Sequence, residues 1–126
     1  MTTTNAAQAF RAAVEGLRMD QAIEQLHPDA VFHSPIVHKP YVGRDAIAPI
    51  LLAVGQVFTD FRYSAEFGSD TGHVLLFEAN VGDRQVQGVD ILQYAPDGRI
   101  GEFTVMVRPY SAATELRTRM AAMLDG

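Results

Sequence analysis

The sequence predicts an α+β domain in which helices cover a curved, mostly antiparallel sheet. Two observations carry this prediction. Apolar residues recur at helical spacing through most of the first half of the chain, whereas residues 59–108 alternate between apolar and polar. A chain of 126 residues with 48% hydrophobic content is the size of one compact core. We therefore expect a single domain over 1–126, with a frayed terminus at residues 1–4.

Two helices are expected before the first strand. The first runs from Asn5 to about Leu17, and Asn5 is its predicted N-cap. The second is short and is capped by Asp20. The dipeptide His27-Pro28 ends it, because a residue before proline avoids the helical region.

A strand over 30–35 and a third helix follow. The helix is expected over Arg44–Phe58, with Pro49 as a complication, because an interior proline removes a helical hydrogen bond. We therefore favour a helix that begins near Ala48, which would place Pro49 in its first turn.

The second half of the chain is predicted to form four strands and a last helix. The strands cover 61–67, 73–81, 86–94 and 100–108, with tight turns at Gly82-Asp83 and at 96–99. Pro109 stops the last strand because it has no N–H to donate. Ser111 is the expected cap of a helix that reaches about Leu124.

Composition argues against several classes of function. The net charge is −5 and the basic residues are scattered, which is unlike a nucleic-acid-binding protein. The sequence holds no cysteine, and its four histidines lack the spacing of a zinc pair, so neither a metal nor a cofactor is expected. No apolar run is long enough to span a membrane, and the start lacks the pattern of a signal peptide. We therefore expect a cytoplasmic protein.

Asp90 is the leading candidate for a functional residue. It lies within a predicted strand and shares a face with Val86, Gly88 and Leu92. Burial would raise the pKa of its carboxyl group, so that the group could donate or accept a proton near neutral pH. The alternative is a structural acid that a nearby tyrosine, arginine or backbone N–H satisfies. The sequence leaves both interpretations open.

Several short motifs, in their order and spacing, resemble the nuclear transport factor 2-like superfamily and its SnoaL-like branch. The motifs are Asp29-Ala30-Val31-Phe32, Ser34-Pro35, Gly43-Arg44-Asp45-Ala46-Ile47, Gly88-Val89-Asp90 and Asp97-Gly98-Arg99-Ile100 followed by Glu102. The resemblance covers nearly the whole chain. It implies a cone-shaped, cystatin-like α+β barrel with an apolar pocket between sheet and helices, and a dimer formed through the sheet. The superfamily includes ketosteroid isomerases, polyketide cyclases, limonene-1,2-epoxide hydrolases, scytalone dehydratase and non-catalytic binding proteins.

The resemblance also suggests roles for single residues. Asp90 is similar to the pocket acid that ketosteroid isomerases use as a protonated donor to an oxyanion. Ser34 stands where those isomerases have an aspartate base, and Phe10 stands where they have a tyrosine donor. The expected pocket residues besides Asp90 are Phe10, Phe32, Ser34, Val54, Phe58, Gly88, Phe103, Val105 and Val107.

Three functions follow from these expectations. In the first, a small hydrophobic molecule binds in the pocket and Asp90 moves a proton, in an isomerase, cyclase, lyase or hydrolase reaction. In the second, the pocket binds such a ligand without reaction. In the third, the protein is a dimeric interaction module and its pocket is only core. A homodimer is expected because a sheet with apolar side chains on both faces needs a second cover.

Overall fold

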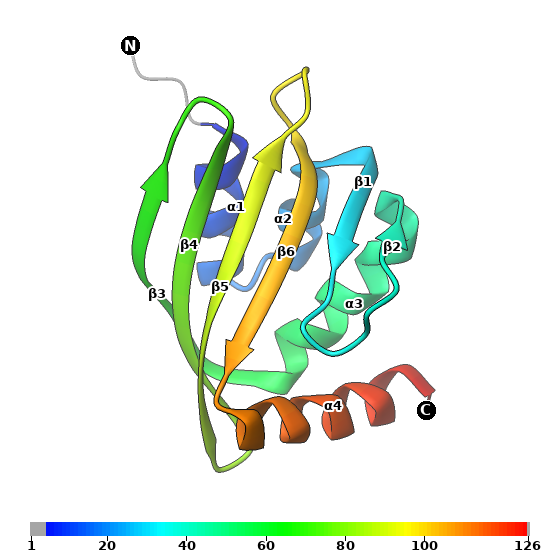
Figure 1. Ribbon diagram of the computed structural model, residues 1–126, viewed down its shortest axis with the longest axis vertical. Coiled ribbons are helices and arrows are strands. Elements are labelled where there is room, and N and C mark those ends of the chain that lie inside the picture. The colour runs from blue at the N-terminus through cyan, green and yellow to red at the C-terminus, as the bar shows by residue number, and fades with distance from the viewer. Residues whose placement is uncertain (1–4, 126) are drawn as a thin grey trace.

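The computed structural model describes residues 5–125, which form four helices and six strands (Figure 1). The expectation for residues 1–4 lies outside the described residues. In chain order the elements are α1 (Ala6–Glu15), α2 (Met19–Glu24), β1 (Leu26–His33), β2 (Tyr41–Val42), α3 (Arg44–Val57), β3 (Phe58–Gly68), β4 (Gly72–Val81), β5 (Arg84–Tyr94), β6 (Ile100–Arg108) and α4 (Tyr110–Asp125). The predicted α+β class is confirmed.

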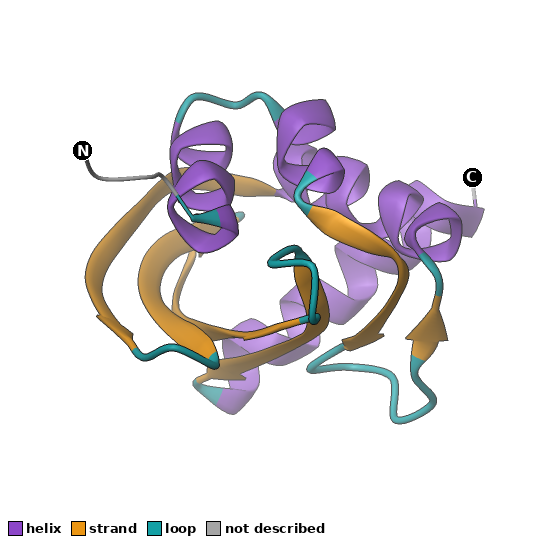
Figure 2. Cartoon of the chain, turned by 90° about the horizontal axis from the view of Figure 1, so that it is seen from above, coloured by secondary structure: helices purple, strands orange, loops and turns teal. Residues whose placement is uncertain are grey.

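The strands form one mixed sheet in the order β2-β1-β6-β5-β4-β3. Neighbouring strands are antiparallel except β1 and β6, which are parallel. The sheet curls around the helices but stays unclosed, with β2 and β3 at its edges (Figure 2). The concave face of this sheet and the helices that cover it enclose the core.

The helix predictions need correction at several ends, including that of α2, which ends at Glu24 rather than at His27-Pro28. Asn5 caps α1 as predicted, in a capping box with Gln8. Asp20 does not cap α2, because the helix begins one residue earlier and Asp20 lies in its first turn. Pro49 lies in the interior of α3, which begins at Arg44. Pro49 has no N–H to donate to the carbonyl group of Asp45, four residues earlier. Both residues are exposed, so water can replace the missing hydrogen bond. Finally, α4 begins at Tyr110, so that Ser111 is helical.

The sheet predictions need correction mainly around β1. This strand begins at Leu26, before Pro28, because Leu26 pairs with Ile100 and the Ile100 N–H donates to Gln25. A shift of register between Leu26 and Val31 accommodates the proline. The two-residue strand β2 was not predicted, and β3 and β4 begin earlier than expected, at Phe58 and Gly72.

The predicted inner face of β5 is confirmed. Val86, Gly88, Asp90 and Leu92 are buried, whereas the residues between them are more exposed. On the concave side, Phe103 of β6 packs edge-on against Phe10 of α1, with ring centroids 5.3 Å apart. Among the described residues, no helix is long and apolar enough to cross a membrane.

Candidate functional site

A cavity of about 220 Å³ lies between the concave face of the sheet and the helices. Of the side chains expected to line a pocket, eight do so: Asp90, Phe10, Phe32, Ser34, Val54, Phe58, Phe103 and Val105. These residues come from α1, α3, β1, the loop after β1, β3, β5 and β6, so the cavity depends on the whole fold. Its lining is almost entirely apolar, as expected of a pocket for a small hydrophobic molecule.

Gly88 and Val107 do not line this cavity. A Cβ atom at Gly88 would lie 2.4 Å from Cζ of Phe77, so the Phe77 ring occupies the space above the glycine and lines the cavity in its place. Val107 is the register partner of Gly88 and packs near the second core cluster, which includes Leu116 of α4. The alternation of Leu75, Phe77 and Ala79 on β4 was the signal that could have identified Phe77 from the sequence.

Asp90 is 5% exposed and lies at the wall of the cavity. The phenol O–H of Tyr63 donates a hydrogen bond of 2.8 Å to its Oδ2. Burial raises the pKa of Asp90 to about 7, although the hydrogen bond from Tyr63 opposes this rise. Both protonation states of Asp90 are therefore populated near neutral pH.

Sequence analysis allowed a nearby tyrosine as the partner of Asp90 but did not identify it as Tyr63. The alternation over 61–67 put Tyr63 on one face with Phe61, but nothing in the sequence paired it with Asp90. In the sheet, β4 lies between the strands of the two residues, and the register partners of Asp90 and Tyr63 on β4 are Leu75 and Phe77. The phenol group reaches Asp90 across β4 on the concave face of the curled sheet. Burial and the charge of Asp90 both raise the pKa of Tyr63 well above its usual value.

A polar network lies over the Tyr63 ring. Cζ of Arg11 lies 5.7 Å from the ring centroid, in a cation–π contact. The same guanidinium group donates to Glu66 at 2.6 Å, and Glu66 is hydrogen-bonded to His73 at 2.8 Å. The hydrogen bond with His73 and the charge of Arg11 lower the pKa of Glu66. Tyr63 is thus held between a buried acid and a paired cation.

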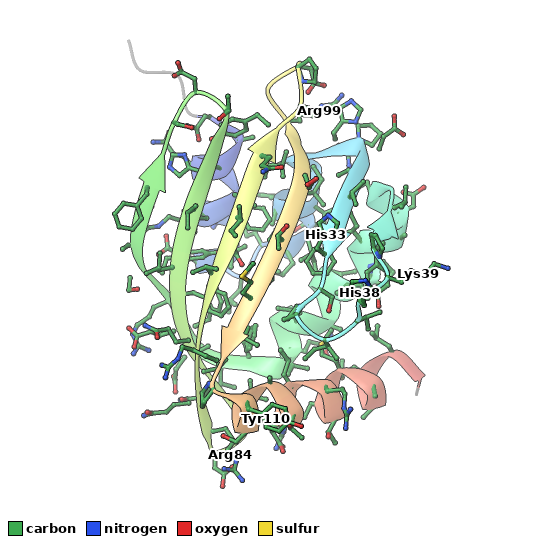
Figure 3. The ribbon with its side chains drawn as sticks, in the orientation of Figure 1. His33, His38, Lys39, Arg84, Arg99 and Tyr110 are labelled. Atoms are coloured by element: carbon green, nitrogen blue, oxygen red, sulfur yellow. The ribbon has the colours of Figure 1, made fainter. Side chains whose placement is uncertain are left out.

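The remaining candidates have simpler environments. The Oγ atom of Ser34 accepts the backbone N–H groups of Ile36 and Val37, at 3.0 and 3.3 Å, and so shapes the turn after β1. His33 lies at the end of β1 (Figure 3). Its side chain is 3.8 Å from Glu102, and it is not among the residues that line the cavity. Within the described part of the chain, no cluster of three or more His, Cys, Asp or Glu side chains could hold a metal ion.

Fold and pocket together define a cystatin-like α+β protein with an acid at the wall of an apolar cavity. Residues 7–103 match the model of the SnoaL-like domain family, and the chain belongs to that family. The resemblance drawn from the sequence is thereby confirmed. None of the curated proteins compared with the chain matches it.

Many solved structures are similar to the chain, among them the following three. An uncharacterised protein with a cystatin-like fold from Silicibacter pomeroyi is 32% identical, with a TM-score of 0.91, and the match covers 95% of this chain and 85% of that one. A steroid delta-isomerase from Pseudomonas aeruginosa is 38% identical, with a TM-score of 0.90 and coverages of 98% and 93%. A putative SnoaL-like polyketide cyclase from Shewanella denitrificans shares the fold at 16% identity, with a TM-score of 0.66 and coverages of 90% and 95%.

Proposed function

We propose that the protein binds a small, mostly apolar molecule in the cavity and that Asp90 exchanges a proton with it in an isomerase-type reaction. The observation that carries this proposal is a nearly inaccessible carboxyl group, at the wall of an apolar cavity, whose pKa is about 7. Such a group can act as base and acid in turn at neutral pH. The 38% identity to a protein named as a steroid delta-isomerase supports the same class of reaction.

The chemistry requires one base and one hydrogen-bond donor. As a carboxylate, Asp90 would remove a proton from the carbon next to a carbonyl group and return it to a second carbon, so that a double bond moves and no other reactant is consumed. Tyr63 would stabilise the carboxylate through its 2.8 Å hydrogen bond. Ser34 uses its oxygen as an acceptor of backbone N–H groups, so its hydroxyl hydrogen can donate to the carbonyl oxygen of the substrate.

Binding without reaction is the alternative, and one observation favours it. Tyr63 already satisfies Asp90 without any ligand, as it would in a carrier whose acid is structural. In addition, Phe10 and Ser34 replace the tyrosine and aspartate that the resemblance to ketosteroid isomerases would place there.

The test uses cyclic β,γ-unsaturated ketones of one to four rings, with turnover followed by the absorbance of the conjugated product. We expect turnover by the wild type and a loss of about 100-fold or more in Asp90→Asn. Asp70→Asn, which changes an exposed loop acid, is the matched control and should keep full activity. Undiminished turnover in Asp90→Asn would contradict the role of Asp90. Saturable binding without product in both proteins would favour the carrier.

We further propose that the protein forms a homodimer through the convex face of the sheet. Val89 of β5 and Met106 of β6 are register partners on this face, and Met106 is 56% exposed. Leu76 of β4 is the register partner of Val89, so the apolar side chains continue across three strands. A second copy of the chain offers a surface of the same character, which a two-fold dimer requires.

A further inference from the structure

Three exposed apolar side chains belong to the lining of the cavity. Leu17 follows α1, Val37 lies in the loop after β1, and Leu124 lies near the end of α4. All three line the cavity, yet they are 75%, 42% and 43% exposed. We call these three residues the apolar collar. Because large apolar side chains are usually covered, a collar of this kind indicates that a ligand extends beyond the enclosed part of the cavity.

Arg117 is a charged and exposed residue of the same lining. It lies in α4, one turn before Ala121, which also lines the cavity. The charged side chains of the cavity lining are Asp90 and Arg117, one at the buried wall and one at the solvent end.

Arg117 differs in its ion pairing from a close neighbour. The ion pairs found among the described side chains do not include Arg117, whereas Arg119 pairs with Glu115 at 2.8 Å. The guanidinium group of Arg117 can therefore pair with a ligand without breaking a salt bridge to another described side chain.

We infer that the ligand is amphipathic: an apolar body fills the cavity, and a carboxylate or similar acidic group lies at the mouth beside Arg117. The inference rests on the proposed binding of an apolar molecule and adds its chemical class and its orientation. The collar covers the part of the apolar body that emerges, and Arg117 pairs with the acid.

The opposite orientation is unfavourable. An acidic group at the buried end would lose its hydrating water. It would also lie beside the carboxyl group of Asp90, and the two negative charges would repel each other. At the mouth the same group keeps part of its hydration and has a cation beside it. Since the whole chain carries a net charge of −5, it gives anions no general attraction, so a local cation is needed to select them.

The test compares three probes with one apolar body, namely phenylhexanoate, phenylhexanol and phenylhexylamine. Dissociation constants are measured by calorimetry at low salt, because the chain holds no tryptophan to report binding by fluorescence. We expect the acid to bind about two- to five-fold more tightly than the alcohol, as for an exposed ion pair, and the amine to bind most weakly. Added salt should reduce the preference.

Variants on one helix make the test specific. Arg117→Gln should remove the preference for the acid over the alcohol and leave the affinity for the alcohol unchanged. Arg117→Lys, which keeps the positive charge, should retain the preference for the acid. Arg119→Gln, two residues further along α4, should keep it. Equal binding of acid and alcohol by the wild type, or an unchanged preference in Arg117→Gln, would overturn the inference while leaving the proposed function intact. Failure of all three probes to bind would count against the proposed function as well.

Discussion

At Asp90, burial couples the charge of one carboxyl group to the stability of the protein. Its pKa is about 7 in the folded chain, against an ordinary value of 3.8. A raised pKa means that folding favours the neutral acid. The stabilisation is therefore complete below about pH 4 and is lost as the pH rises through about 7. The difference between the two pKa values corresponds to about 4 kcal/mol.

Asp90→Asn should remove this pH dependence, since asparagine stays neutral and its side-chain oxygen can still accept from Tyr63. We expect the free energy of unfolding of the wild type to fall relative to that of Asp90→Asn, by up to about 4 kcal/mol between pH 4 and pH 8. Urea unfolding of both proteins across this range measures the difference. A difference that does not change with pH would mean that Asp90 is not protonated in the folded state.

Tyr63 sets how far the pKa of Asp90 rises, because its hydrogen bond favours the carboxylate. Tyr63→Phe should therefore raise the pKa of Asp90 further. Arg11→Met should raise it by less, since Arg11 only holds the ring of Tyr63 in place. The carboxyl carbon of Asp90, followed by NMR during a pH titration, reports these values. Tyr94→Phe is the control, because it removes only the 3.3 Å hydrogen bond between the Tyr94 hydroxyl and His73, at the far end of the network from Asp90. An unchanged pKa in Tyr63→Phe would show that the hydrogen bond is absent in solution.

Gly88 of β5 allows β4 and β6 to pack closely on either side of it, because it has no side chain. A Cβ atom there would approach not only Cζ of Phe77 but also the carbonyl oxygen of Met106, at 2.7 Å, and this oxygen is part of the backbone of β6. Gly88→Ala should therefore destabilise the protein by about 1–3 kcal/mol, as overpacking usually does. Urea unfolding measures this loss, and Ser64→Ala on the exposed side of β3 should change little. A neutral Gly88→Ala would mean that both the Phe77 ring and the backbone of β6 can shift to make room.

Elements with a clear period could be predicted from the sequence. The alternation along β5 identified the buried face and placed Asp90 on it, because side chains of a strand point to opposite sides in turn. The capped start of α1 was equally readable, since Asn5 and Gln8 form the capping box within one turn.

Features that depend on distant pairing could not be predicted. β2 has two residues, too few for a period, and exists because Val42 and Tyr41 pair with β1. The early start of β1 depends on Ile100, far along the chain. For the same reason Tyr63 was found only in the structure, since its approach to Asp90 requires the curl of the sheet.

At the scale of the whole molecule, the proposed dimer makes the convex face of the sheet testable. Met106→Glu would place charges at the centre of this face, and we expect the dimer to dissociate while the cavity, on the opposite face, is unchanged. Light scattering after size exclusion measures the mass. Leu52→Glu, at a similarly exposed residue of α3, should leave the mass unchanged. A wild type that is monomeric at high concentration would refute the dimer.

The strand order has a consequence for how the protein assembles in time. Strands β3 to β6 are joined by short turns and can pair as soon as they are made, whereas β1 must wait for β6, the last strand of the chain. The Phe32–Phe103 contact, which belongs to the cavity wall, crosses this late seam. We therefore expect the cavity to be among the last features to form and among the first to open. Hydrogen exchange should accordingly find the amides of β1 less protected than those of β4, and a bound ligand should protect the β1–β6 seam most.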